Sequence, residues 1–224
     1  MTSSNVTYTA IRARIEAGAR RAGREVRLLA VSKTQPAAAI RALADAGQLE
    51  FGENYVQEAL GKRRELSDSR LEWHLIGPLQ SNKCREVAEN FDWLQSLDRT
   101  KLIGPLDRFR PADRPPLNVL IQVNIDDEAS KSGCSPDAIG ALDAAIAAAP
   151  RLLLRGLMAI PQPHPDFERR RAAFRRMRAL YDALRAAHPG IDTLSLGMSD
   201  DFELAIEEGA TLVRIGTALF GPRQ

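Results

Sequence analysis

The chain has 224 residues, of which 44% are hydrophobic. That fraction is enough to bury a substantial core, so the composition excludes an intrinsically disordered protein. The 31 lysines and arginines nearly balance 29 acidic residues and leave a net charge of +2, which gives no strong field to recruit nucleic acid or an anionic membrane.

The first predicted element is a helix over residues 5–22, ahead of any strand. Residues 27–32 form a short, almost entirely apolar run, which is typical of a buried strand. Pro36 and Gly47 then bracket an Ala-rich segment, as expected for a helix with proline near its start and glycine just past its end.

The same alternation of strand and helix recurs along the rest of the chain. A helix over 137–149 is expected after Ser135-Pro136, and a last helix is expected to be capped by Ser199 and ended by Gly209. Further strands are predicted at 50–53, 72–76, 92–97, 117–124, 152–160, 192–197 and 211–216. Their starts lie about 20 to 40 residues apart, the size of a strand-helix unit.

Eight such units in succession predict an α/β fold, a single-domain (β/α)8 or TIM barrel over residues 1–224, with the helix at 5–22 as an addition. An open, doubly wound parallel sheet is the alternative. No linker of changed composition divides the chain.

No apolar run approaches the roughly 18 residues that a membrane span needs, and residues 1–10 lack the apolar core of a signal peptide. Two cysteines, Cys84 and Cys134, are too few for a disulfide framework. These features predict a cytoplasmic protein with reduced thiols.

Lys33 follows the first predicted strand directly. The functional groups of such barrels gather where the strands end, so this amine is expected at the barrel mouth in a partly dry site. Desolvation favours a neutral, nucleophilic amine that could form a Schiff base, whereas a rim lysine that reaches solvent is the structural alternative.

The last two strand ends predict an anion site. Ser199 follows strand 192–197, and Gly216 and Thr217 follow strand 211–216, where backbone N–H groups and hydroxyls of such barrels often bind a phosphate. Ser199 could instead be only a helix cap. Asp200 and Asp201 weigh against an adjacent phosphate unless their side chains point away.

Arg214 shares one face of its predicted strand with Leu212 and Gly216. An inward arginine must face a ligand or pair with a carboxylate such as Glu53, and the sequence leaves both open. His74 lies within a strand, where a hydrogen-bonded core residue is more frequent than a reactive one. The scattered histidines and cysteines form no metal ligand set and no Cys–His pair.

Glycines close four of the predicted strands, at Gly52, Gly77, Gly197 and Gly216. Glycine at these places either makes a turn or lets a ligand approach the backbone.

Several blocks together closely resemble the pyridoxal phosphate homeostasis proteins, also called the proline synthase co-transcribed family. The resemblance runs in order from about residue 26 to residue 221. It is carried by the motifs at 28–33 (LLAVSK), 51–58 (FGENYVQE), 73–83 (WHLIGPLQSNK), 131–133 (KSG), 156–161 (GLMAIP), 194–201 (LSLGMSDD) and 213–221 (VRIGTALFG).

The resemblance implies a barrel like the N-terminal domain of alanine racemase, with pyridoxal 5'-phosphate (PLP) as cofactor. It implies that Lys33 forms an internal aldimine with PLP, that Asn54 lies near the 3-oxygen of the ring, and that Arg214 contacts the pyridine nitrogen. It also implies that Ser199, Gly216 and Thr217 hold the phosphate, and that Met198 and His74 line the pocket.

The function that the resemblance implies is a non-catalytic PLP carrier or buffer in vitamin B6 and amino-acid homeostasis. Racemases of this class take their second base, a tyrosine, from a C-terminal domain that is not expected after Gln224, and Tyr8, Tyr55 and Tyr181 are no obvious replacements. The alternatives are a small PLP enzyme such as a weak racemase and, without PLP, a Schiff-base aldolase. Apo-PLP enzymes or salvage enzymes are the expected partners, and a monomer is expected.

Overall fold

The computed structural model of the chain describes residues 3–67, 70–128 and 132–221. Its strands form one closed parallel barrel in sequence order, in which β1 pairs with β8 and completes the ring. This closure confirms the predicted barrel and rules out an open doubly wound sheet. The strands are β1 (Arg27–Val31), β2 (Glu50–Glu53), β3 (Glu72–Leu75), β4 (Trp93–Leu97), β5 (Leu117–Gln122), β6 (Leu152–Met158), β7 (Thr193–Ser195) and β8 (Leu212–Ile215).

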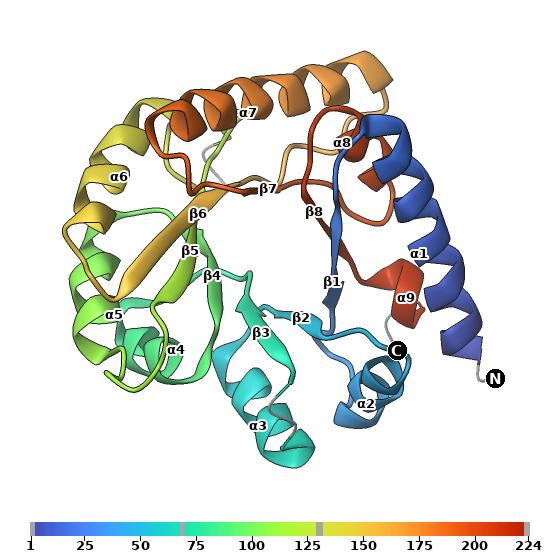
Figure 1. Cartoon of the computed structure of the whole chain (residues 1–224), viewed down its shortest axis with the longest axis horizontal. Coiled ribbons are helices and arrows are strands. Elements are labelled where there is room, and N and C mark those ends of the chain that lie inside the picture. Colours follow the sequence, from blue (N-terminus) through green and yellow to red (C-terminus); the bar gives the residue numbers. More distant parts are fainter. Residues whose placement is uncertain (1–2, 68–69, 129–131, 222–224) are drawn as a thin grey trace.

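Helices surround the ring of strands (Figure 1), as the alternation predicted. They are α1 (Ser3–Ala22), α2 (Ala37–Asp45), α3 (Val56–Leu66), α4 (Cys84–Asn90), α5 (Ile103–Phe109), α6 (Ile139–Ala147), α7 (Phe167–Ala187), α8 (Phe202–Glu207) and α9 (Thr217–Phe220). Short 3₁₀ turns stand before α4, α5 and α6, at Ser81–Lys83, Thr100–Leu102 and Pro136–Ala138. Among the described residues, no helix is long and apolar enough to cross a membrane.

The helix after β7 starts later than the sequence suggested. It begins at Phe202 with Asp201 at the N-cap position, so Ser199 does not cap it. The hydroxyl of Ser199 instead accepts a hydrogen bond of 3.4 Å from the backbone N–H of Ala218, in the first turn of α9. This residue therefore joins the loop after β7 to the loop after β8.

The core has two parts, because successive side chains of a strand point to opposite faces. The larger part lies between the strands and the helices, where Phe51 of β2 meets Trp73 of β3. A smaller apolar cluster lies inside the barrel and consists of Trp93, Leu120 and Met158. The rest of the interior holds a row of buried polar side chains, which is described below.

Candidate functional site

A pocket of about 230 Å³ lies where strands β1, β2, β3, β6, β7 and β8 end. All the residues predicted for the cofactor site, except His74, line it: Lys33, Asn54, Met198, Ser199, Arg214, Gly216 and Thr217. Larger hollows exist on the outside of the barrel, such as one of about 470 Å³ beside α1 and the start of β1. We place the site at the strand ends because functional groups of parallel barrels converge there.

Lys33 comes directly after β1 and is half-buried. The residue before it, Ser32, is fully buried, and its hydroxyl donates to Oε1 of Glu53 at 2.6 Å. The residue after it, Thr34, has a φ of +64°, a left-handed conformation that is costly for a β-branched residue. The Thr34 N–H donates to Oε1 of Glu58 at 2.5 Å, which holds this conformation in place.

A single ammonium group joins these two supports. Nζ of Lys62, on α3, donates to the backbone oxygen of Ser32 at 2.7 Å, to Oε1 of Glu53 at 2.7 Å and to Oε1 of Glu58 at 2.6 Å. We call Ser32, Glu53, Glu58 and Lys62 the Lys62 cluster. Burial is the main cause that raises the pKa of the Glu53 carboxyl above its ordinary value, while Lys62 and Ser32 act in the opposite direction. The cluster fixes the backbone on both sides of Lys33 and so fixes where that side chain starts.

Sequence reasoning missed this cluster, although Glu53 and Glu58 both stand in the motif 51–58. The sequence offers Glu53 only as a partner for Arg214. The spacing of Glu58 and Lys62, four residues apart on one helix, was the available signal.

Arg214 is almost fully buried on β8 and also lines the pocket. Its guanidinium donates to Oγ of Ser195 at 2.6 Å and to the backbone oxygen of Ala159 at 2.9 Å. Burial lowers its pKa to about 10, so the group stays a cation at neutral pH. Neither hydrogen-bond partner is a carboxylate, and Glu53 pairs with Lys62 instead. A buried cation that neutral acceptors hold at the wall of a pocket is suited to an electron-rich ligand.

The two acids after β7 behave differently. Oδ1 of Asp201 accepts from the backbone N–H of Met198 at 2.7 Å, so this carboxylate is engaged with its own loop. Burial raises the pKa of Asp201. Asp200 lines the pocket and is exposed, which leaves a negative charge at the rim beside Ser199.

His74, which was predicted to line the cofactor pocket, lies elsewhere. Ile76 lines the pocket in its place, because side chains on one face of a strand recur at every second residue and His74 is one layer deeper in the barrel. The His74 ring is fully buried and stacks on Trp93, with ring centroids 5.1 Å apart.

Of the glycines that close strands, Gly216 is the one that lines this pocket. Gly77 is required by packing, since a Cβ there would lie 2.2 Å from the backbone oxygen of Asn54. Gly197 has a φ of +86° and makes a turn. For these two positions the turn and packing interpretation holds.

Two further lysines stand in the motifs that carry the family resemblance. Lys83, in the motif 73–83, forms an ion pair of 3.1 Å with Glu86 and does not line the pocket. Lys131, in the motif 131–133, lies outside the described residues.

The family described as alanine racemase, N-terminal domain, matches residues 6–224. The chain is 57% identical to the pyridoxal phosphate homeostasis protein of Pseudomonas aeruginosa over 216 residues, which cover 95% of this chain and 93% of that protein. It is 56% identical to the protein of the same name from Escherichia coli K12 over 219 residues, which cover 95% of this chain and 94% of that protein.

Two solved structures extend the comparison. PipY from Synechococcus elongatus PCC7942, solved with PLP bound, matches with a TM-score of 0.86 and 37% identity over 98% of this chain and 100% of that chain. An alanine racemase from Corynebacterium glutamicum matches with a TM-score of 0.65 and 22% identity over 96% of this chain and 61% of the racemase, which shows a shared fold. The chain therefore belongs to the family described as alanine racemase, N-terminal domain, alongside the pyridoxal phosphate homeostasis proteins.

Proposed function

We propose that this protein binds PLP in the pocket at the strand ends and holds it reversibly through Lys33, as a carrier or buffer of the cofactor. The observation that carries the proposal is that Lys33 and the buried cation of Arg214 line the same pocket. The names of the relatives and the PLP-bound PipY structure support it.

The residues present fit this cofactor. PLP, when bound, supplies an aldehyde that a lysine amine attacks reversibly with release of water. Lys33 is the amine that lines the pocket, the amide of Asn54 would hold the 3-oxygen of the ring, and Ser199, Gly216 and Thr217 would hold the phosphate through hydroxyl and backbone donors. Pockets for drug-sized ligands typically measure roughly 300 to 1,000 Å³. The volume of about 230 Å³ lies just below that range, as expected for a smaller ligand such as PLP.

Arg214 favours holding the cofactor over catalysis. Arg214 would contact the pyridine nitrogen and would disfavour its protonation, because two positive charges would then be adjacent. An unprotonated ring withdraws electrons less strongly and so stabilises a carbanion less. We propose that the protein keeps a reactive aldehyde bound and releases it to apo-PLP enzymes or salvage enzymes.

A weak racemase is the second candidate function, and one observation favours it. Asp200 lines the pocket and carries a carboxylate, so it could serve as the second base that racemisation needs. The described tyrosines are placed less favourably. Tyr8 and Tyr181 are buried in the helical layer, and Tyr55 is exposed and does not line the pocket.

We also propose that the protein is cytoplasmic and monomeric and acts as one domain over residues 1–224. Two cysteines without a disulfide between them agree with a reducing compartment. Sedimentation velocity at several protein concentrations tests the oligomeric state, and a sedimentation coefficient that rises with concentration would contradict a monomer.

Absorption spectroscopy between 300 and 500 nm tests cofactor binding. The parental protein with PLP is expected to show a visible band that borohydride abolishes, and Lys33→Ala is expected to lack that band. Lys101→Ala, which removes an exposed lysine outside the pocket, is the matched control and should keep it. A protein that PLP cannot colour would contradict the proposal and would favour a Schiff-base aldolase without PLP.

Exchange of the α-proton in heavy water separates a carrier from an enzyme. A carrier is expected to leave the α-protons of L- and D-amino acids unexchanged beyond the rate of free PLP, as followed by proton NMR. Exchange that depends on the protein and is lost in Asp200→Asn would establish the racemase instead.

A further inference from the structure

A continuous chain of buried hydrogen bonds leads away from Arg214 through the barrel interior. Oγ of Ser195 accepts from Arg214 at 2.6 Å and donates to Oε1 of Gln95 at 2.7 Å. Nε2 of Gln95 lies 2.9 Å from Nδ1 of His74. All of these side chains are buried. Ser195 is on β7 and Gln95 is on β4, which are not neighbours in the barrel, so the chain crosses the interior.

The donors in this chain all point the same way. A guanidinium can only donate, so Ser195 must accept from Arg214 and use its own proton toward Oε1 of Gln95. The amide nitrogen of Gln95 is then left to donate to Nδ1 of His74. This order leaves the proton of a neutral His74 ring on Nε2, at the far end of the chain.

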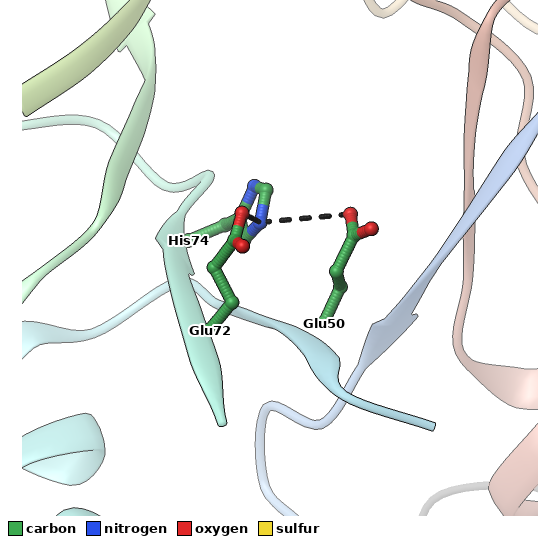
Figure 2. A group of neighbouring side chains, drawn as sticks. All are labelled: Glu50, Glu72 and His74. Carbon is green, nitrogen blue, oxygen red and sulfur yellow. Dashed lines mark ion pairs between the residues drawn. The ribbon is translucent and has the colours of Figure 1, made fainter. Parts of the chain in front are cut away.

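Carboxylates stand at that far end. Figure 2 shows Glu50, Glu72 and His74 with their side chains directed toward one another. Nε2 of His74 lies 3.3 Å from Oε1 of Glu72 and 3.8 Å from Oε2 of Glu50. Trp93 stacks on the imidazole ring, and its indole N–H donates to Glu72. The ring of His74 is thereby held in its plane by Trp93 and at Nδ1 by Gln95, whereas Nε2 makes no hydrogen bond within the described residues and lies within ion-pair distance of Glu72.

These three residues also offer ligand atoms within 4.8 Å of one another, of the types that bind a divalent cation. Two features weigh against a cation. The direction of the hydrogen bonds from Arg214 to His74 places a proton on Nε2 of His74, where a ligating imidazole needs a lone pair. Nη1 of Arg27 also lies 3.6 Å from Oε2 of Glu50 and already supplies a positive charge there.

We propose that Ser195, Gln95 and His74 are positioning residues for Arg214, with Glu72 as the anchor of the chain. The inference rests on the proposed PLP site. Ser195 is one of the two acceptors that hold the guanidinium, and its hydroxyl can keep its orientation only while Gln95 accepts from it. Gln95 in turn is held by His74, which is fixed by Trp93 and Glu72. These hydrogen bonds thus hold a buried cation at the pocket wall through neutral acceptors, and the charge of Asp201 acts on Arg214 without a hydrogen bond to it.

The test compares two isosteric substitutions in the barrel. Gln95→Met removes the middle of the chain, and Gln122→Met makes the same change at a buried glutamine that donates to the backbone oxygen of Ser132 and does not line the pocket. With the holo-proteins at neutral pH, Gln95→Met is expected to release PLP about three- to tenfold faster than the parent, because this is the size of effect that the loss of one hydrogen bond produces. Gln122→Met is expected to release PLP at the parental rate.

A spectroscopic readout separates positioning from general loosening. With ¹⁵N-labelled PLP, the pyridine-nitrogen resonance is expected to move toward its protonated value in Gln95→Met, because a less constrained Arg214 opposes protonation less. Ser195→Ala breaks the same chain at another link and should give the same shift, and it serves as the test if Gln95→Met does not fold. The double variant should be no worse than either single one, since both remove one connection.

The outcomes are distinct. If the parent binds PLP but Gln95→Met and Ser195→Ala match Gln122→Met in release rate and nitrogen resonance, the positioning role is wrong and the proposed function stands. If the parent does not bind PLP, the proposed function itself fails. A double variant whose effect is the sum of the single ones would contradict a continuous chain.

Discussion

Lys33 is held through its neighbours rather than only by its own strand. Ser32 and Thr34 are both anchored by Glu53, Glu58 and Lys62, the members of the Lys62 cluster that lie on β2 and α3. The cluster holds a fully buried carboxylate, Glu53, and the ammonium of Lys62 is its counter-charge. Removing one member of a buried ion pair leaves an uncompensated charge, which costs more than the pair itself contributes.

We expect Lys62→Met to lower the free energy of unfolding by about 3 to 5 kcal/mol, because it leaves the buried Glu53 carboxylate without its counter-charge. The double variant Lys62→Met/Glu53→Gln should recover a large part of that loss. Urea denaturation measures both, with the exposed Lys101→Met as control, for which a change within about 0.5 kcal/mol is expected.

The loss should also depend on pH. Burial raises the pKa of Glu53 in the folded protein, and Lys62 is one of the groups that lower it, so Lys62→Met should raise it further. A carboxyl with a raised folded pKa contributes stability that is present at low pH and is lost as the pH rises through that pKa. Lys62→Met should therefore be less destabilising near about pH 5 than near about pH 7.5. A loss that is equal at both pH values would contradict this account.

At the scale of the elements, the pocket depends on how closely the ends of β2 and β3 approach. Gly77 and the backbone of Asn54 are in contact across this join, and the hydroxyl of Ser96, on β4, donates to the backbone oxygen of Gly77 at 2.6 Å. Asn54 lines the pocket. The position of one pocket wall is therefore set by an approach that only a residue without a side chain allows.

We expect Gly77→Ala to weaken PLP binding and to lower the stability of the protein, because its Cβ would lie 2.2 Å from the Asn54 oxygen and must push the two strand ends apart. The control is Gly61→Ala in α3, where a Cβ meets nothing within 4 Å. That change should stabilise the helix by roughly 0.5 to 1 kcal/mol and leave PLP binding unchanged. PLP titrations and urea denaturation of both variants measure the effects, and equal PLP affinities would show that this approach does not shape the pocket.

At the scale of the whole molecule, the pocket lies across the seam that closes the barrel. Lys33 follows β1, and Gly216 and Thr217 follow β8, the strand with which β1 pairs to complete the ring. Helix α1 packs against this side of the barrel, where Arg14 forms an ion pair of 2.8 Å with Glu203 of α8. A ligand that contacts both sides of the seam binds only the closed barrel and therefore stabilises the whole fold.

We expect PLP at about one hundred times its Kd to raise the free energy of unfolding by about 2.7 kcal/mol. At the same PLP concentration the gain in Lys33→Ala should be smaller, because the remaining contacts bind more weakly. Urea denaturation with and without PLP measures this. Equal gains in both proteins would mean that PLP binds somewhere other than the Lys33 pocket.

Some of this molecule follows from the order of residues alone. The strands were predicted within one or two residues of their observed bounds, because short apolar runs such as 27–32 can only be buried on both faces. The positions of Lys33, Arg214, Ser199 and Thr217 followed in turn, since parallel strands of one barrel must end at the same rim. The resemblance also implied that His74 lines the pocket, whereas its strand ends one residue later, at Leu75, and the side chain lies deeper in the interior.

The sequence by itself thus determined the barrel, the rim and most of the residues that meet there, because these depend on local periodicity and on the geometry of parallel strands. The tertiary structure alone decided which buried charges are paired. Glu53 joins Lys62 rather than Arg214, and Ser195 meets Gln95 across the barrel, at a separation of 100 residues. Such pairings depend on the direction and depth of side chains from distant strands, to within a hydrogen-bond length, and no pattern along the chain carries that information.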